Sequence, residues 1–327
     1  MAAIRNSIQP RLLSNPPEIA VVVASRGRPE RLRATLACLA GCRDQTRDDG
    51  VVFEVVLVDD NDPGATPAAA DLAPAGLLTR VVSGPRTGRA GARNVGADAT
   101  AAHWVVFLDA DTLVGPEFVR EHAAAAANGV FVHGRMRELP AAEHFLTQWA
   151  DASDDEIRRA RAGIVDPDAP RDPRRRLVAN ALERTVEELD AGQHSGIAPW
   201  LGCVGANVGM ARADWERVGG FDEDFGRTWG CEDLEFGYRL TEAGVCRRLS
   251  PGALGLHLSH ARPDRWEQHA ENLDRFLELH PGPEVEALAQ LLGPRGTPAG
   301  YAEAVLGSSP GQPASGRTPV PSGGGRR

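Results

Sequence analysis

The sequence has no apolar run that approaches the roughly 20 residues a membrane-spanning helix needs. Its first residues, MAAIRNSIQPRLL, contain neither a continuous apolar core nor an obvious cleavage site, so no signal peptide is expected. The five cysteines are scattered and include no C-x-x-C pair, which excludes the spacing of a zinc knuckle. We therefore expect a soluble, cytoplasmic protein without a transmembrane segment.

Positive charge is also scarce relative to negative charge. The 327 residues include 36 Lys and Arg against 45 Asp and Glu, a formal net charge of −9. The resulting field disfavours nonspecific contact with nucleic acid, and no nucleic-acid partner is expected. A local basic pocket for a phosphorylated small molecule is compatible with this balance. Neither G-x-G-x-x-G nor G-x-x-x-x-G-K-[ST] occurs, so neither the dinucleotide nor the Walker type of phosphate loop is supported.

Short apolar runs alternate with helical patterns through the first half of the chain. The runs are typical of strands buried on both faces, and they cover residues 18–25, 51–60, 77–84 and 103–118. Between the first two, Leu32, Leu36 and Leu39 recur at helical spacing, and Gly41 is expected to end that helix. This alternation predicts an α/β fold with a mostly parallel central sheet flanked by helices.

Carboxylates follow two of these predicted strands. In HWVVFLDADTLVGPEF the apolar residues lead to Asp109 and Asp111, which would share one face if the strand continued through them. Asp59 and Asp60 follow another strand. Ligands of parallel sheets bind beyond the carboxyl ends of the strands. Asp109 and Asp111 fit either a solvated strand end or a site for Mn²⁺ or Mg²⁺. DDNDPG fits either a tight turn or a nucleoside-binding acid.

Two further clusters carry possible chemistry. Glu232 and Asp233, in WGCEDLEFGYRL, stand at the predicted start of a helix, where the positive helix end favours ionised carboxylates. They fit either a general base or ordinary N-terminal charging of a helix. His257 and His260, in GLHLSHARP, could each supply a neutral nitrogen ligand or be structural.

The segment GPRTGRAGARNVG provides arginines near the start of a predicted helix. An arginine fork on a phosphate is one use of such a segment, and the other is a helix start with solvated arginines. The arginines concerned are Arg86, Arg89 and Arg93.

In this order, four segments resemble the GT-A-fold glycosyltransferases of the family-2 type. The segments are VVVASRGRPERLRATLACL, FEVVLVDDNDPG, GARNVGADATAAHWVVFLDADT and VGGFDEDFGRTWGCEDLEFGYRL. The last is also similar to the C-terminal half of galactosyltransferases and polypeptide N-acetylgalactosaminyltransferases. The resemblance spans roughly residues 19–260. It implies a GT-A (nucleotide-diphospho-sugar transferase) fold and a metal-dependent hexosyltransferase that moves a sugar from a nucleotide-diphosphate donor, expected to be a UDP-sugar, to an acceptor hydroxyl.

The resemblance also implies a role for each matching residue. It implies a catalytic base at Asp233, or else at Glu232. It implies a site for Mn²⁺ or Mg²⁺ at Asp109, Asp111 and His257, with His260 as the alternative histidine. The donor nucleotide would contact Asp60 through its base or ribose, and Trp229 would belong to a lid. The full set implied to bind the donor is Ala24, Ser25, Asp60, Arg93, Asp109 and Trp229.

Two local departures from family patterns bear on specificity. The usual P-x-Y/F-N after the first strand is replaced by residues 24–28, ASRGR, so an aromatic residue to stack on the base is missing and the nucleotide stays open. Asp233 follows the motif's glutamate as in inverting relatives, whereas the retaining, polypeptide-modifying relatives carry Asn there, which favours inversion. A sugar nucleotidyltransferase and a non-catalytic nucleotide-sugar-binding protein are the alternatives.

The acceptor, a glycan, lipid, peptide or small natural product, is left open because it depends on the divergent segment before residue 200.

The expected domain organisation follows from the positions of these segments. We expect an N-terminal extension at 1–17, a nucleotide-sugar-binding half at 18–135, an acceptor-binding and catalytic half at 136–262, C-terminal helices at 263–300 and a disordered tail at 301–327.

Overall fold

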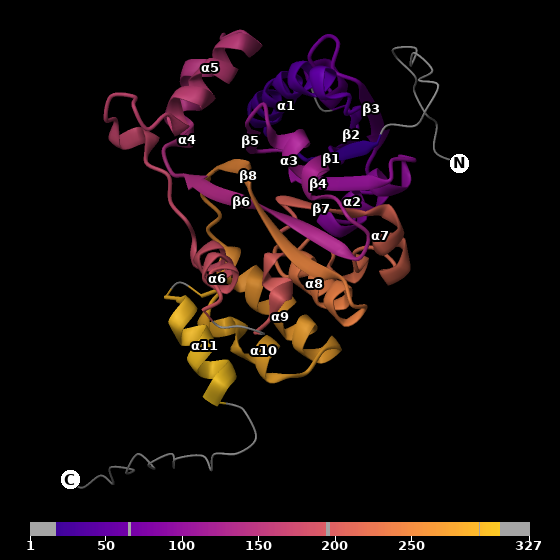
Figure 1. The fold of residues 1–327 in the computed structure, drawn as a ribbon, viewed down its shortest axis with the longest axis vertical. Helices are drawn as coiled ribbons and strands as arrows, with labels where there is room; N and C mark the ends of the chain where they lie inside the picture. Colours follow the sequence, from indigo (N-terminus) through magenta and orange to yellow (C-terminus); the bar gives the residue numbers. More distant parts are fainter. Residues whose placement is uncertain (1–17, 65–66, 194–196, 294, 308–327) are drawn as a thin grey trace, which may run out of the picture.

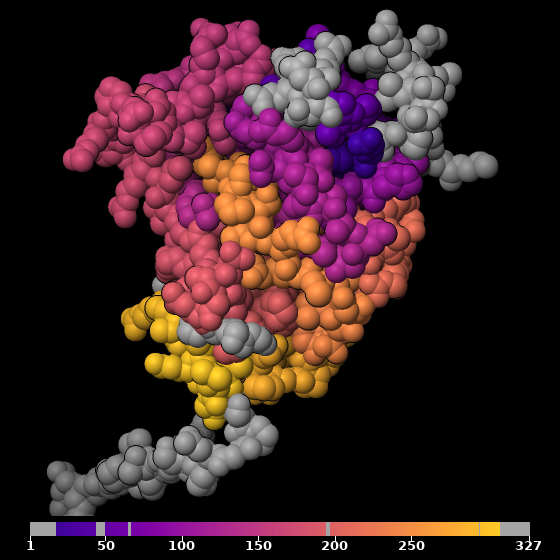
Figure 2. Space-filling model, in the orientation of Figure 1, coloured from indigo at the N-terminus to yellow at the C-terminus, as the bar shows by residue number. Residues whose placement is uncertain are grey.

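The computed structural model describes residues 18–64, 67–193, 197–293 and 295–307. One sheet crosses the molecule and carries helices on both faces (Figure 1). In the space-filling view the yellow C-terminal helices lie at the opposite end of the described chain from the indigo first strands (Figure 2). The N-terminal extension predicted at 1–17 lies outside the described residues.

The sheet contains eight strands within the described residues, in the order β3-β2-β1-β4-β7-β6-β8-β5. Strands β3, β2, β1 and β4 run parallel to one another, whereas β7 is antiparallel to both β4 and β6. The predicted α/β fold is confirmed, with its parallel part in the first half and a mixed second half. The strands are β1 (Ile19–Ser25), β2 (Phe53–Asp59), β3 (Thr79–Ser83), β4 (Trp104–Asp109), β5 (Thr112–Val114), β6 (Val130–Leu139), β7 (Asn207–Ala211) and β8 (Cys246–Leu258).

Helices cover both faces of the sheet and its second half. They are α1 (Pro29–Asp49), α2 (Arg89–Asp98), α3 (Phe118–Ala125), α4 (Ala142–Trp149), α5 (Asp154–Val165), α6 (Ala181–Asp190), α7 (Arg212–Val218), α8 (Glu232–Glu242), α9 (Arg265–Leu279), α10 (Pro283–Glu286) and α11 (Pro298–Gly307). Short 3₁₀ segments lie between them at 69–72, 173–175, 199–202, 223–225 and 287–290.

Strand β1 explains why the predicted strands are continuously apolar. Val21 and Val23 belong to the core beneath α1, α3, α4 and α5, whereas Ala20 and Val22 belong to the core beneath α2, α7 and α8. Because both faces of the strand are covered, neither set of alternate residues can be polar. A third core joins the C-terminal helices to α6 and α8 around Trp200, which is 1% exposed.

Two predicted boundaries are wrong. Helix α1 continues past Gly41, whose missing side chain leaves room for the side chain of Arg158 of α5, and it ends before Gly50, whose φ is +75°. Residues 301–307, which the sequence assigned to the tail, belong to α11, in which Tyr301 and Val305 are buried. Residues 308–327 lie outside the described part of the chain.

The register of the sheet places the predicted acids at one edge. Ser25 at the end of β1 is paired with Asp59 of β2, and Ala24 is paired with Asp109 of β4. The segment 103–118, however, is not one strand. Strand β4 ends at Asp109, and after a two-residue turn β5 starts at Thr112 beside His257 of β8. Asp109 is therefore the last residue of β4, whereas Asp111 lies in the turn that follows it, so the two do not continue along one strand.

Candidate active site

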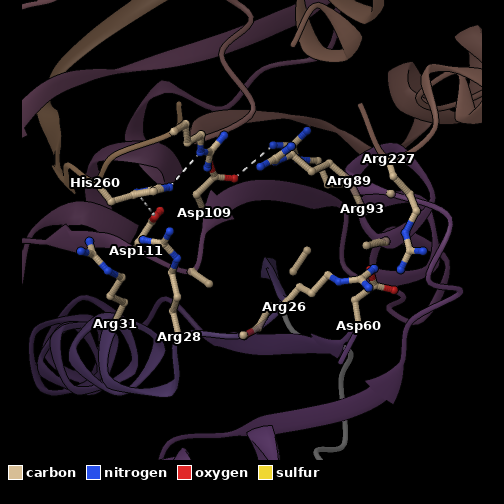
Figure 3. Close-up of a pocket in the computed structure, with 17 residues that line it drawn as sticks. Arg26, Arg28, Arg31, Asp60, Arg89, Arg93, Asp109, Asp111, Arg227 and His260 are labelled. Carbon is tan, nitrogen blue, oxygen red and sulfur yellow. Dashed lines mark hydrogen bonds and ion pairs between the residues drawn. The ribbon is translucent and has the colours of Figure 1, made fainter. Parts of the chain in front are cut away.

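A pocket of about 410 Å³ opens at the carboxyl ends of β1, β2 and β4. Residues from the first strand, the start of α2 and the loop before α9 all reach it (Figure 3). Its lining is rich in charge, with both signs represented. The lining residues are Ala24, Ser25, Arg26, Gly27, Arg28, Arg31, Asp60, Gly88, Arg89, Ala92, Arg93, Asp109, Ala110, Asp111, Arg227, His260 and Arg262.

The sequence left open whether the two adjacent acids at the end of β2 serve a turn or a binding site. In the structure Asp59 serves the turn, and Asp60 faces the pocket. Asp59 accepts hydrogen bonds from the backbone N–H and the side-chain amide of Asn61 at 3.2 and 2.7 Å, which is turn chemistry. Asp60 lines the pocket, is 4% exposed, and accepts the backbone N–H of Arg86 at 2.6 Å. Burial raises the pKa of Asp60, and that hydrogen bond partly offsets the rise.

Arg93 joins the first half of the site to the second. Its Nη2 donates to Asp109 Oδ1 at 3.0 Å, and its Nη1 donates to Glu232 Oε1 at 2.9 Å. Arg93 and Glu232 are 4% and 5% exposed. Burial by itself would lower the pKa of Arg93, but the two carboxylates raise it. The predicted donor contact of Arg93 is untested. In this structure its guanidinium group is hydrogen-bonded to Asp109 and to Glu232.

Asp111 meets both candidate histidines. Its Oδ2 lies 3.4 Å from His257 Nε2 and 3.5 Å from His260 Nδ1. One atom from each of the three side chains can be chosen so that all lie within 4.8 Å of one another, as a metal site requires. Asp109 is not part of this group, because its carboxylate turns to Arg93. The structure thus brings Asp111 together with both His257 and His260, the histidine that the resemblance gave as the alternative.

The chemistry of this group fits a cation. Burial lowers the pKa of His260 to about 4, so the ring is neutral. Its Nε2 accepts the N–H of Arg262 at 2.8 Å, so the ring proton is on Nδ1, the buried nitrogen that lies 3.5 Å from Asp111. A cation bound at Nδ1 would therefore require the other tautomer of the ring and the loss of the Arg262 contact. His257 Nδ1 is 2.8 Å from Glu138 Oε2, a contact that orients Nε2 towards Asp111. Although burial opposes it, hydrogen bonds to Asp111 and Glu138 raise the pKa of His257 to about 10. A bound cation would displace that proton.

The acidic pair at the start of α8 also divides into two environments. Burial alone would raise the pKa of Glu232, but Arg93 lowers it. Asp233 accepts the backbone N–H of Gly205 at 2.9 Å. Burial, followed by the charge of Glu232, raises the pKa of Asp233 to about 6. The prediction that α8 begins at these acids is confirmed.

Trp229 lies beside the pocket and outside its lining. Its backbone N–H donates to Gln268 Oε1 at 3.1 Å, and the guanidinium of Arg262 lies 5.4 Å from the centre of its ring. The loop before Trp229 packs closely on the start of α2, where a Cβ on Gly88 would lie 1.8 Å from the carbonyl oxygen of Gly226. A lid role for Trp229 stays a prediction.

The structure therefore brings most of the predicted residues to one place. Of the predicted set, Ala24, Ser25, Asp60, Arg93, Asp109 and Asp111 line the pocket, and Trp229, Glu232, Asp233 and His257 lie next to these. Sequence reasoning missed several cationic lining residues and the carboxylate behind His257. The two arginines in SRGRP, directly after a predicted strand, were a usable signal. The missed residues are Arg26, Arg28, Arg31, Arg227, Arg262 and Glu138.

Comparison with known proteins agrees with this geometry. Residues 20–148 match the model of glycosyl transferase family 2, and residues 193–260 match the model described as the N-terminal domain of galactosyltransferase. A mannosyltransferase from Pyrobaculum calidifontis, solved with GDP-Man and Mn²⁺, has a similar fold with a TM-score of 0.54 at 17% identity, covering 93% of this chain and 77% of that one. The chain therefore has the GT-A fold, residues 20–148 resemble glycosyl transferase family 2, and residues 193–260 resemble a galactosyltransferase domain.

The curated relatives include proteins named as a glucosyltransferase and a chondroitin synthase. Validoxylamine A glucosyltransferase of Streptomyces hygroscopicus subsp. jinggangensis (strain 5008) is 32% identical over 284 residues, which cover 83% of this chain and 63% of that protein. Chondroitin synthase of Escherichia coli is 28% identical over 252 residues, 73% of this chain and 34% of that protein. The chain spans about three fifths of the length of the validoxylamine A glucosyltransferases it matches. Across the described residues, no helix combines the length and apolarity that crossing a bilayer requires.

Proposed function

We propose that the protein is a metal-dependent, inverting glycosyltransferase that moves a sugar from a nucleotide-diphosphate donor, a UDP-sugar by expectation, to an acceptor hydroxyl. The observation that carries the proposal is the buried bridge through Arg93. It ties Asp109, in the pocket, to Glu232, which starts the helix that bears Asp233. We assign residues 18–135 to the nucleotide-sugar half and 136–262 to the acceptor and catalytic half.

The donor nucleoside is proposed to bind at the end of β2. One oxygen of Asp60 is already occupied by a backbone N–H, and the other lies 4.0 Å from Arg26. That second oxygen is free to accept a hydrogen bond from a base N–H or a ribose hydroxyl. The backbone at Ala24 and Ser25 supplies the adjoining wall.

The cation is proposed to be held by Asp111, His257 and His260, in place of the set with Asp109 that the sequence predicted. Two imidazole nitrogens suit a transition-metal ion such as Mn²⁺ better than Mg²⁺, which prefers oxygen ligands. When bound, the ion supplies positive charge that offsets the charge developing on the nucleoside diphosphate as it departs.

Asp233 is proposed as the base. With a pKa of about 6 it is mostly ionised at neutral pH, yet it is basic enough to take the proton of an acceptor hydroxyl. The hydroxyl oxygen then forms a bond to the anomeric carbon as the bond to the diphosphate breaks, and this single displacement inverts the configuration. Glu232 is less suited, because Arg93 holds it ionised and occupies one oxygen.

A donor screen tests the proposal. The relatives named glucosyltransferases make a nucleotide-activated glucose the first donor to try, with validoxylamine-like small molecules among the acceptors. We expect release of the nucleoside diphosphate in Mn²⁺, loss of that release in EDTA, and a product with the inverted anomeric configuration by NMR.

Asp111→Ala should abolish metal-dependent turnover, and unchanged transfer in that variant would refute the assignment. Pyrophosphate release would indicate a nucleotidyltransferase, and donor binding without turnover would indicate a non-catalytic protein.

A further inference from the structure

The segment 228–231, directly before the two acids of α8, has an unusual backbone. Gly230 has a φ of +107°, and Cys231, the residue that precedes the first turn of α8, has a φ of +67°. A side chain with a Cβ atom disfavours the left-handed region that Cys231 occupies. Such a conformation persists only where the surrounding structure holds it. The contacts of this segment therefore decide the direction in which α8 begins.

Two amide side chains of α9 make such contacts. The backbone N–H of Trp229 donates to Gln268 Oε1 at 3.1 Å. Asn272 Nδ2 donates to the carbonyl oxygens of Thr228 at 3.1 Å and of Gly230 at 2.8 Å. Asn272 is 4% exposed, so water competes little for these hydrogen bonds. We call Gln268 and Asn272 the amide clamp, because they hold the peptide group before Trp229 and the peptide group after Gly230.

The ring of His269 fills the space beside the amide clamp. A Cβ atom on Gly230 would lie 2.9 Å from His269 Cδ2, and the sulfur of Cys231 lies 3.5 Å from His269 Nε2. Gln268 and His269 stand four and three positions before Asn272, so both are its neighbours on one face of α9. That face therefore meets the strained segment with hydrogen bonds and with a packed ring.

Helix α9 is anchored well enough to serve as a support. Leu273 and Phe276 belong to the same apolar core as Leu234 in the first turn of α8, and Figure 1 shows the two helices next to each other. The helix begins at Arg265, beyond every residue that the sequence assigned to the site. A support for the site thus comes from outside the segments that carry its chemistry.

The partners of the two acids depend on the direction in which α8 begins. Glu232 accepts a hydrogen bond from Arg93, and Asp233 accepts the backbone N–H of Gly205 at 2.9 Å. Both acids follow Cys231 directly. A return of Cys231 to a right-handed conformation would turn the start of the helix, and Asp233 would move away from Gly205.

We propose that Gln268 and Asn272 are positioning residues, which hold the strained segment 228–231 and, through it, the carboxyl of Asp233. The catalytic consequence rests on the proposed function, in which Asp233 is the base, but the hold on the segment does not. Both residues of the clamp are described by the structure, and neither lines the pocket. Loss of the clamp should therefore slow the reaction and leave the donor bound as before.

The thiol of Cys231 reports on the clamp without any substrate. It is 2% exposed, so N-ethylmaleimide reaches it only when the segment opens. Cys38 and Cys42 are buried in a different core and report opening of the whole fold. Asn272→Leu removes both donated hydrogen bonds at similar size. By peptide mass spectrometry, we expect it to raise the labelling rate of Cys231 relative to Cys38 about tenfold or more.

Variants of the other clamp residue make the test independent of one substitution. Gln268→Met removes the acceptor for the N–H of Trp229 and should also raise the labelling ratio. Gln268→Glu keeps an acceptor oxygen and should restore slow labelling. The control is Glu271→Gln, which removes an exposed carboxylate from the same helix and should leave the ratio unchanged.

Two measurements follow the effect to Asp233. The amide of Gly205, whose partner is the carboxyl of Asp233, should exchange hydrogen about tenfold faster in Asn272→Leu. In the proposed transfer, the same variant should lower kcat about tenfold to 100-fold with KM for the donor within about twofold. The acidic limb of its pH profile should move from about 6 towards 3.8, because the carboxyl becomes less buried. A simple loss of folded protein would lower kcat without moving that limb.

The outcomes separate this proposal from the proposed function. A raised labelling ratio with faster exchange at Gly205 supports the clamp even if the wild type transfers no sugar. An unchanged ratio in both Asn272→Leu and Gln268→Met overturns it, even if the protein proves to be a transferase. A raised ratio with wild-type exchange at Gly205, or with a wild-type kcat and pH profile, overturns the link to Asp233.

Discussion

Asp233→Asn tests the assignment of the base through stability as well as activity. The carboxyl of Asp233 has an ordinary pKa of 3.8 and a folded-state pKa of about 6. Because the folded-state value is raised, the stabilising contribution is present below pH 3.8 and is lost as the pH rises through about 6. A shift of about 2 pH units corresponds to about 3 kcal/mol in total, of which about 2 kcal/mol falls between pH 4.5 and pH 7.

The quantity to compare is the free energy of unfolding of the wild type minus that of Asp233→Asn, measured at two pH values. Asn also loses hydrogen bonds at this place, but those losses are the same at each pH and cancel. Urea unfolding at pH 4.5 and pH 7 should therefore show the wild type losing about 2 kcal/mol relative to Asp233→Asn. A difference that stays constant with pH would refute the raised pKa and remove the main reason for choosing Asp233.

The same carboxyl should control the rate. Because the base must be ionised, kcat/KM of the wild type should fall about tenfold for each unit of pH below 6. Asp233→Asn should lower the rate by about 100-fold to 10,000-fold while the donor still binds. Glu242→Gln removes an exposed carboxylate from the far end of the same helix and should leave the rate unchanged.

Three further changes test the surrounding structure. Arg93→Met leaves the buried carboxylate of Glu232 and the half-buried carboxylate of Asp109 without a counterion, so the free energy of unfolding should drop by about 3 to 5 kcal/mol in urea; a drop below 1 kcal/mol would contradict the buried bridge. Glu138→Gln weakens the support of His257, and titration should show Mn²⁺ binding about 10-fold to 100-fold more weakly, whereas equal affinity would argue against His257 as a ligand. Gly88→Ala places a methyl group against the backbone of the following loop, so thermal unfolding should show a loss of about 1 to 3 kcal/mol, and an unchanged melting temperature would argue against the close contact.

Much of the first half could be predicted from local patterns. Val21 and Val23 alternate with Ala20 and Val22 without a polar residue, a pattern typical of a strand covered on both faces. The end of helix α1 could not be predicted, because Gly41 serves close packing against another helix, and only the position of that helix reveals this. Local patterns describe what a residue can do. Packing against distant segments determines what it does.

The site divides in the same way. Local sequence patterns set where strands and helices end. The sequence by itself therefore determined that acids follow the apolar strands and that two acids stand at the start of a helix. Tertiary structure decided the partners. A bend after β4 sends Asp109 to Arg93 and Asp111 to His257, although the two aspartates stand two positions apart. No local pattern encodes that choice, because Asp111 and His257 are 146 positions apart in sequence and meet only where β5 pairs with β8.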